Sequence, residues 1–191
     1  LEHGVDGLVM PLGNDDLWTE AANLVDAKLE VSSENISSID LVPAKITAKE
    51  SGGVGERVCV DLIERLSIGE GMVVGSSATA MALIHGETIP TEFVPTRPFR
   101  IGAGAVHAYC LMADDSTKYL SELVSGDEVA IISATGQRRS AFIGRLKIER
   151  RTFLILRIEA ESTTGQVILQ QAETVRLVQP DGNVVSITNI S

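Results

Sequence analysis

The sequence predicts an α+β protein: a residual βα unit of an N-terminal α/β domain, followed by a predominantly antiparallel β region with a small barrel-like C-terminal part. Two observations predict this class. An apolar run at 4–11 precedes a segment of helical spacing at 14–30, whereas short β-rich runs separated by turn signals follow Leu41. Aromatic residues make up only 4% of the chain, so the core is expected to consist of Val, Ile, Leu and Ala, which suits strands.

Residues 1–40 are predicted to be the end of a truncated N-terminal α/β domain and a linker. "GVDGLVMP" has the composition of a short buried strand. "NDDLWTEAANLVDAKLE" has apolar residues near helical spacing, with Asn14 or Asp15 placed to cap its start. The polar run "VSSENISSID" is typical of a linker. Because the chain opens without Met, inside an apparent α/β unit, we expect it to be a fragment.

Two further regions are predicted. Residues 41–112 are expected to form a β-rich catalytic core, and residues 113–191 a small β-barrel-like domain that is truncated at its C-terminus. Runs such as "RVCVDLI", "GMVVGSS" and "TFLILRIEAES" alternate with turn signals such as "SGG", "GEG" and "PDGN". One short helix is expected at "SATAMALIHG". A weak echo between "YLSELVSGDEVAIISATGQRRSAFIG" and "TVRLVQPDGNVVSITNIS" favours a small barrel.

Composition excludes several classes of partner. The formal net charge is -10, and the basic runs "GQRR" and "KIERR" are too short for a nucleic-acid footprint. No apolar run approaches the roughly 18 residues that span a bilayer, so no membrane partner is expected. Cys59 and Cys110 lie in unrelated segments without a CxxC pattern, which favours free thiols in the cytoplasm. Exposed β edges favour a homo-oligomer.

Glycine-rich stretches are the first candidates for ligand binding. In "SGGVGERVCVD" the glycines could let a backbone approach an anion, with Arg57 and Asp61 following; a hairpin turn is the alternative. "IGEGMVVGSSATA" superficially resembles a dinucleotide fingerprint, but β-type residues follow Gly71, which favours a turn and a strand. "LIHGET" places His85 and Glu87 on one face of an extended segment, as an oriented base or half of a metal site. Because a third ligand is lacking, no metal is predicted.

The richest segment is "TRPFRIGAGAVHAYC". Arg97 and Arg100 flank a stiff Pro-Phe pair, and guanidinium forks are suited to a carboxylate or a pyrophosphate. Gly102 and Gly104 could let a ligand lie against the backbone before His107. The alternative is that His107 is a hydrogen-bonded interior histidine and the arginines pair with some of the 26 carboxylates. From the residues alone, both interpretations stay open.

Long blocks carry a resemblance to a known family. "GERVCVDLIERLSIGEGMVVGSSATAMALIHGET", "TRPFRIGAGAVHAYC", "GRLKIERR" and "ILQQAETVRLV" together resemble the archaeal-type 3-dehydroquinate synthase family (3-dehydroquinate synthase II) over Val54 to Ser191. "EHGVDGLVMP" is similar to the end of that family's N-terminal α/β region, most of which is missing here. The resemblance implies NAD-dependent oxidative deamination of 2-amino-3,7-dideoxy-D-threo-hept-6-ulosonate and its cyclisation to 3-dehydroquinate, early in the shikimate route to aromatic amino acids.

Such a reaction needs a carboxylate clamp, a base and a group that polarises a carbonyl. The resemblance implies that Arg97, Arg100 and Arg57 bind the substrate carboxylate or the cofactor pyrophosphate beside Gly102 and Gly104. It implies His107 as the leading base, with His85 and Glu87 as the second choice. Lys147 could polarise a carbonyl, although a solvated strand lysine is the favoured alternative, and the expected orienting residues are Asp61, Glu70 and Tyr109. If NAD or a catalytic lysine is held in the missing half, this fragment is inactive. The alternative function is a non-catalytic small β-barrel module for binding or oligomerisation.

Overall fold

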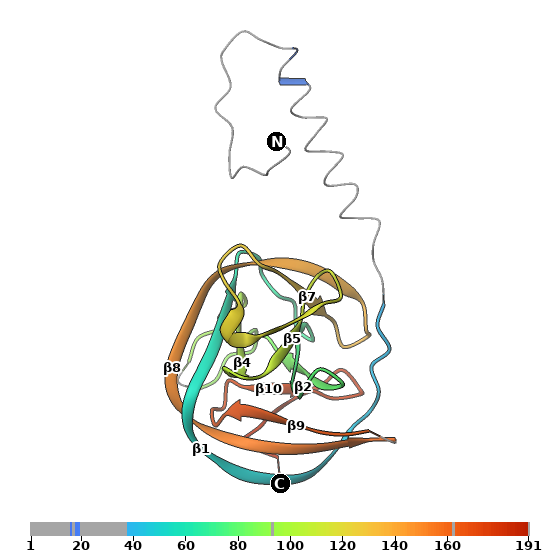
Figure 1. Ribbon diagram of the computed structural model, residues 1–191, viewed down its shortest axis with the longest axis vertical. Helices are drawn as coiled ribbons and strands as arrows, with labels where there is room; N and C mark the ends of the chain where they lie inside the picture. Colours follow the sequence, from blue (N-terminus) through green and yellow to red (C-terminus); the bar gives the residue numbers. More distant parts are fainter. Residues whose placement is uncertain (1–15, 17, 20–37, 93, 162, 191) are drawn as a thin grey trace. The chain divides into compact units, whose positions relative to one another are not determined.

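The computed structural model describes residues 16, 18–19, 38–92, 94–161 and 163–190 (Figure 1). The chain divides into two compact units, residues 1–36 and residues 37–191, and nearly all described residues belong to the second. They form eleven antiparallel strands and one short 3-10 helix: β1 (Lys45–Leu62), β2 (Gly71–Ser77), β3 (Ala80–His85), β4 (Arg100–Ala105), β5 (Tyr109–Leu111), β6 (Thr117–Tyr119), η1 (Leu120–Glu122), β7 (Glu128–Ile132), β8 (Arg138–Ala160), β9 (Thr163–Gln170), β10 (Arg176–Val178) and β11 (Val184–Ser186).

The expected α+β class is wrong for the described residues, which form an almost entirely antiparallel β structure. The strands follow the order β11-β10-β3-β2-β7-β8-β1-β4, with β5, β6 and β9 as branches. The sheet is open, because the end strands β11 and β4 are not paired with each other, and it is therefore not a closed barrel. The predicted βα unit falls within residues 1–40, almost all of which lie outside the described residues.

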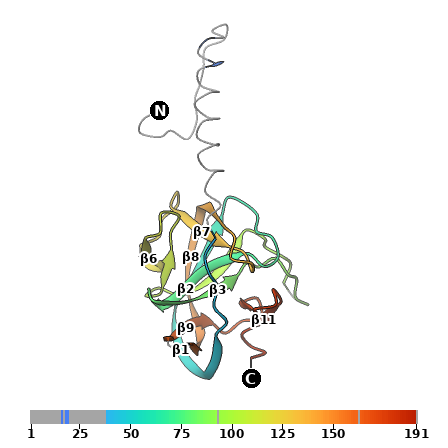
Figure 2. The ribbon, with the colours of Figure 1, turned by 90° about the vertical axis from the view of Figure 1, so that its right-hand side faces the viewer.

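The helix expected at "SATAMALIHG" is also wrong, because Ala80–His85 form β3 and pair with β2 (Figure 2). Ala, Met and Leu favour helices intrinsically, but a strand buried on both faces is equally apolar. Leu83 faces one buried cluster and the next residue, Ile84, faces the other. This alternation has the period of a strand, so the packing of both faces overrides the helical propensity.

The pairing of β1 with β8 is the longest ladder in the described structure. It runs from Lys45 opposite Glu159 to Leu62 opposite Ile143. Three register shifts interrupt it, and the shift after Ser51 coincides with a positive φ at Gly53. Because such bulges bend a ribbon, the two strands curve together around the other strands (Figure 1). This ladder crosses the predicted division at residue 112, and residues 37–191 form a single compact unit.

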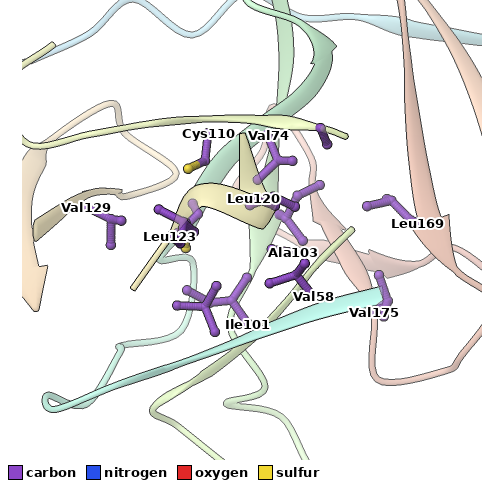
Figure 3. Close-up of a cluster of buried hydrophobic side chains, with 14 of the residues drawn as sticks. Val58, Val74, Ile101, Ala103, Cys110, Leu120, Leu123, Val129, Leu169 and Val175 are labelled. Atoms are coloured by element: carbon purple, nitrogen blue, oxygen red, sulfur yellow. The ribbon is translucent and has the colours of Figure 1, made fainter. Parts of the chain in front are cut away.

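The main core lies inside the curve of β1 and β8. Val58 of β1 packs with Ile101 and Ala103 of β4 and with Leu169 of β9 (Figure 3). Val60 of β1 belongs to the same cluster. Because successive side chains of a strand point to opposite faces, Arg57, Cys59 and Asp61 lie on the other face of β1. Alternation therefore presents a row of polar side chains opposite the core. No helix in the described part of the chain is long and apolar enough to cross a membrane.

Core packing along β8 generates the first prediction. Leu156 is fully buried in the main core, whereas Ile148 on the same strand is exposed. Leu156→Ala should lower the free energy of unfolding by about 2–5 kcal/mol because it leaves a cavity, and Ile148→Ala by less than about 1 kcal/mol. Urea denaturation followed by circular dichroism measures both. Equal effects of the two substitutions would contradict the placement of β8.

Candidate functional site

The polar face of β1 and β8 carries a row of paired charges that we call the charged strip: Arg57 and Asp61 of β1, Arg100 of β4, and Arg145, Lys147, Glu149 and Arg151 of β8. The ladder sets the row, because Arg57 lies opposite Glu149 and Asp61 lies opposite Arg145. On the other edge of β1, Asp61 lies opposite Arg100. Directly opposite residues of neighbouring strands point to the same face, so the register alone brings these side chains together.

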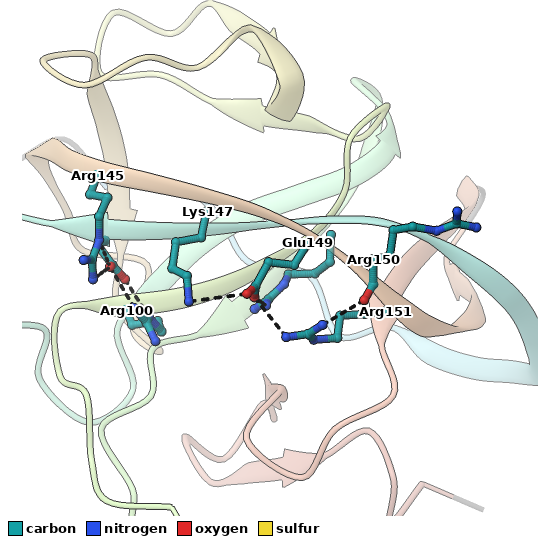
Figure 4. Close-up of polar contacts among 8 residues, drawn as sticks. Arg100, Arg145, Lys147, Glu149, Arg150 and Arg151 are labelled. Carbon is teal, nitrogen blue, oxygen red and sulfur yellow. Dashed lines mark hydrogen bonds and ion pairs between the residues drawn. The ribbon is translucent and has the colours of Figure 1, made fainter.

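Asp61 is bound by Arg100 and Arg145, both labelled in Figure 4. Arg100 donates from Nε and Nη2 to its two carboxylate oxygens, at 2.6 and 2.8 Å. Arg145 donates from Nε and Nη2 to Oδ2, at 2.9 and 2.6 Å. The Asp61 side chain is only 5% exposed and that of Arg100 12%. Burial raises the pKa of Asp61, but the hydrogen bonds and charges of the two arginines outweigh it and hold this pKa below its usual range.

Glu149 is shared by three cations of the strip. Its carboxylate lies 2.6 Å from Arg57, 3.1 Å from Arg151 and 3.6 Å from Lys147. The strip thus sets five cations against two carboxylates, a net charge of +3 within a chain of net charge -10. Burial raises the pKa of the Cys59 thiol, opposite Lys147, to about 11, so Cys59 adds no charge there. The excess positive charge makes this face the candidate anion-binding site.

A second ion pair adjoins the strip. Arg97 Nη1 lies 3.2 Å from the buried Glu87 carboxylate. The Glu87 backbone N–H donates to the Arg100 carbonyl at 2.8 Å, which fixes this pair beside Arg100. The structure therefore gathers Glu87, Arg97, Arg100 and Asp61, four residues that the sequence placed in separate motifs. Each of the three arginines expected to bind an anion already holds a carboxylate: Arg57, Arg97 and Arg100.

The other predicted site residues lie outside the strip. His107 is exposed in the turn beyond the end of β4, and the length of β4 separates it from Arg100. The Tyr109 hydroxyl donates to that of Tyr119 at 2.5 Å. Arg139 donates hydrogen bonds from Nε and Nη2 to the two carboxylate oxygens of Glu70, at 2.8 and 3.0 Å. His85 is buried at the end of β3. The roles of these residues stay predictions.

Gly102 and Gly104 make room for packing on β4. A Cβ at Gly102 would lie 3.2 Å from Val175, and one at Gly104 would lie 3.0 Å from the Ile168 carbonyl oxygen of β9. Gly104 also has a φ of 143°, which disfavours other residues. Their small size therefore lets β9 and the segment before β10 approach β4.

Sequence reasoning missed Arg145, Glu149 and Arg151. Their signal was the alternation of charged residues at every second position from 145 to 151 in "RLKIERR", which is the period of one strand face. The partner strand cannot be identified from that pattern, because β1 lies more than eighty residues earlier in the chain.

Comparison with known proteins gives a consistent result. Residues 43–191 match the family model described as the 3-dehydroquinate synthase II C-terminal domain. The chain is 43% identical over 191 residues to a 3-dehydroquinate synthase of Methanococcoides burtonii, covering 100% of this chain and 48% of that protein. It is 41% identical over 190 residues to one of Methanobrevibacter smithii, covering 100% of this chain and 50% of that protein. It thus spans about half the length of these relatives. No solved structure matches the chain.

The second prediction concerns Asp61. Asp61→Asn should lower the free energy of unfolding by about 3 kcal/mol at pH 7, because Arg100 then keeps its buried charge without a counter-charge. The matched control is Glu50→Gln, which removes the exposed partner of Arg157 and should cost less than about 1 kcal/mol. Urea denaturation at pH 7 measures both.

The effect of Asp61→Asn should also depend on pH. Because the folded-state pKa of Asp61 is lowered, its stabilisation is complete above the unfolded-state pKa of about 3.9 and is lost as the pH falls through the folded-state value. The stability difference between wild type and variant should therefore narrow below about pH 4. A difference that stays constant from pH 7 to pH 3 would contradict the ion pairing.

Proposed function

Because this chain belongs to the 3-dehydroquinate synthase II family, we propose that it contributes the C-terminal domain of an NAD-dependent enzyme that forms 3-dehydroquinate. The observation that carries the proposal is the match of residues 43–191 to that family's C-terminal domain. The proposed substrate is 2-amino-3,7-dideoxy-D-threo-hept-6-ulosonate, a seven-carbon sugar acid with an amino group at C2 and a ketone at C6. The product belongs to the shikimate route to aromatic amino acids.

The proposed reaction exchanges the C2 amine for a ketone and then closes a ring. NAD, when bound, supplies the acceptor for the hydride that leaves C2. Water hydrolyses the resulting imine and releases ammonia, and a carbanion formed beside the C6 ketone attacks the new C2 ketone. The substrate stays anionic throughout, so its carboxylate needs cations held at fixed positions.

The charged strip supports this carboxylate-binding role. Arg57 and Arg100 are largely buried and are paired with Glu149 and Asp61, respectively. The Arg145 side chain, by contrast, is 63% exposed, and Lys147 is partly exposed beside it. We therefore assign positioning to the buried pairs, which fix the two carboxylates, and anion binding to Arg145 and Lys147, which those carboxylates orient.

The glycine pattern around β2 does not fit a dinucleotide cradle. A Cβ at Gly71 would clash with the Ile84 carbonyl oxygen, and one at Gly75 with the Ala80 carbonyl oxygen, so these glycines serve the close approach of β2 and β3. In the described ranges no glycine-rich turn leads into a helix of the kind that holds a pyrophosphate. NAD binding is therefore not assigned to these glycines.

The third prediction tests turnover. A chimera in which this chain replaces its matching stretch of the Methanococcoides burtonii relative should reduce NAD when given the amino-keto sugar acid, measured as NADH absorbance. In the chimera, Arg145→Gln and Lys147→Gln should each lower kcat/KM about tenfold or more, because each removes a charge-assisted bond to the substrate.

The control substitution is Arg157→Gln, on the same strand but paired with the exposed Glu50, which should change kcat/KM less than about twofold. The parent relative, assayed in parallel, shows that the substrate and conditions support turnover. A folded chimera without activity beside an active parent would overturn the proposed reaction for this chain and favour a non-catalytic β module. An active chimera insensitive to both strip substitutions would overturn only the role of Arg145 and Lys147.

A further inference from the structure

A second group of polar side chains lies at the end of β3 and on β10, two strands that carry no residue of the charged strip. Leu177 of β10 is paired with Ile84 of β3, so the antiparallel register places Arg176 beside His85. Ile84 and Leu177 belong to the main core, and alternation directs the two polar side chains to the opposite face of the sheet. Both are buried there, with His85 1% and Arg176 8% exposed.

Arg176 is a largely buried cation for which the described residues supply no counter-charge. Its Nη1 donates to the Ile89 carbonyl oxygen at 3.2 Å, and no carboxylate in the described part of the chain lies within 4 Å of it. Arg57, which is equally buried, instead holds a carboxylate. Nε and Nη2 of Arg176 have no partner among the described residues, yet they are not sealed from solvent. A largely buried charge without a counter-charge stays costly even where part of the guanidinium reaches water, so an anion at this position is stabilised.

His85 adds a second donor without an acceptor. Its Nε2 accepts the backbone N–H of Gly69 at 2.9 Å, so the proton of the neutral ring lies on Nδ1. Nδ1 is fully buried and makes no hydrogen bond of normal geometry among the described residues, and contact with the Gly86 backbone only partly offsets the lowering of the His85 pKa. Burial, and then the positive charge of Arg176, lower the pKa of His85 to about 4, so the ring is neutral near pH 7. His85 therefore offers an N–H without adding charge.

We propose that Arg176 and His85 form an oxyanion site that takes a carboxylate or a phosphate group. Arg176 supplies the charge and a two-pronged fork from Nε and Nη2, and His85 supplies a neutral donor from the neighbouring strand. The Thr88 hydroxyl, 3.5 Å from His85 Nε2, and the Ile89 carbonyl border the site. The assignment of this site to a substrate carboxylate or a cofactor phosphate rests on the proposed function. The binding of an anion there does not depend on that function.

The test is a titration of the full chain, labelled with ¹⁵N, with sodium pyrophosphate and separately with 3-dehydroquinate, each against sodium chloride at equal ionic strength. Nitrogen–proton NMR spectra follow the Arg176 Nε–H and His85 Nδ1–H signals, assigned from Arg176→Gln and His85→Gln. Saturable shifts of both signals are expected, with a Kd of about 1 mM or tighter for at least one anion. The tighter ligand identifies phosphate or carboxylate as the preferred group.

Arg176→Gln should weaken binding about tenfold or more, because it removes the charged fork. Arg157→Gln is the matched control, an exposed arginine on β8 whose loss should leave the Kd within about twofold. If Arg176→Gln fails to fold, Arg176→Lys keeps the charge but lacks the fork and should weaken binding measurably. The absence of saturable shifts in folded wild-type protein, or an unchanged Kd in a folded Arg176 variant, would overturn the site. The titration measures binding and not turnover, so its outcome does not depend on whether the chimera is active.

Discussion

The antiparallel ladder between β1 and β8 is the constraint on which the other features depend. On one edge β8 carries β1 over nearly its whole length, and on the other edge it carries β7 and then β9. Strand β4 joins the sheet through β1, and β2 joins it through β7 and carries the other strands. The sheet is therefore built outward from the β1–β8 ribbon. The ribbon also sets chemistry, because its register decides which carboxylate faces which cation on the polar face.

On the polar face, each carboxylate of the charged strip is shared by more than one cation. Asp61 and Glu149 each satisfy more than one cation, so buried guanidinium groups keep counter-charges while the exposed ones stay in excess. Buried ion pairs contribute little net stability, since desolvation offsets much of their attraction, but they fix geometry. Arg176 breaks this pattern, since it is equally buried and lacks a carboxylate within the described residues. The paired arginines of the strip thus have a structural role, whereas we propose that Arg176 binds an anion.

Local patterns predicted the β character after Leu41, and turn signals such as "PDGN" lie between strands. The α+β class failed, and the helix at Ala80–His85 failed because burial on both faces hides the strand period. Arg57, Asp61 and Arg100 were found as single candidates, but only the long-range register shows that Arg100 pairs with Asp61. His107 follows Arg100 closely in sequence, but the extended strand β4 separates the two residues in space. Arg176 gave no signal, because the lack of a counter-charge is visible only in three dimensions.

The separation of β1 from β8 along the chain has a consequence for folding. The fold has a high contact order, since its largest interface joins residues 45–62 to residues 143–159. Such topologies fold slowly, because the entropy of closing a long loop is lost before the contacts form. During synthesis β1 leaves the ribosome well before its partner exists, and its hydrogen-bonding edge stays open until β8 follows. An unpaired strand edge of this kind is prone to aggregation until its partner pairs with it.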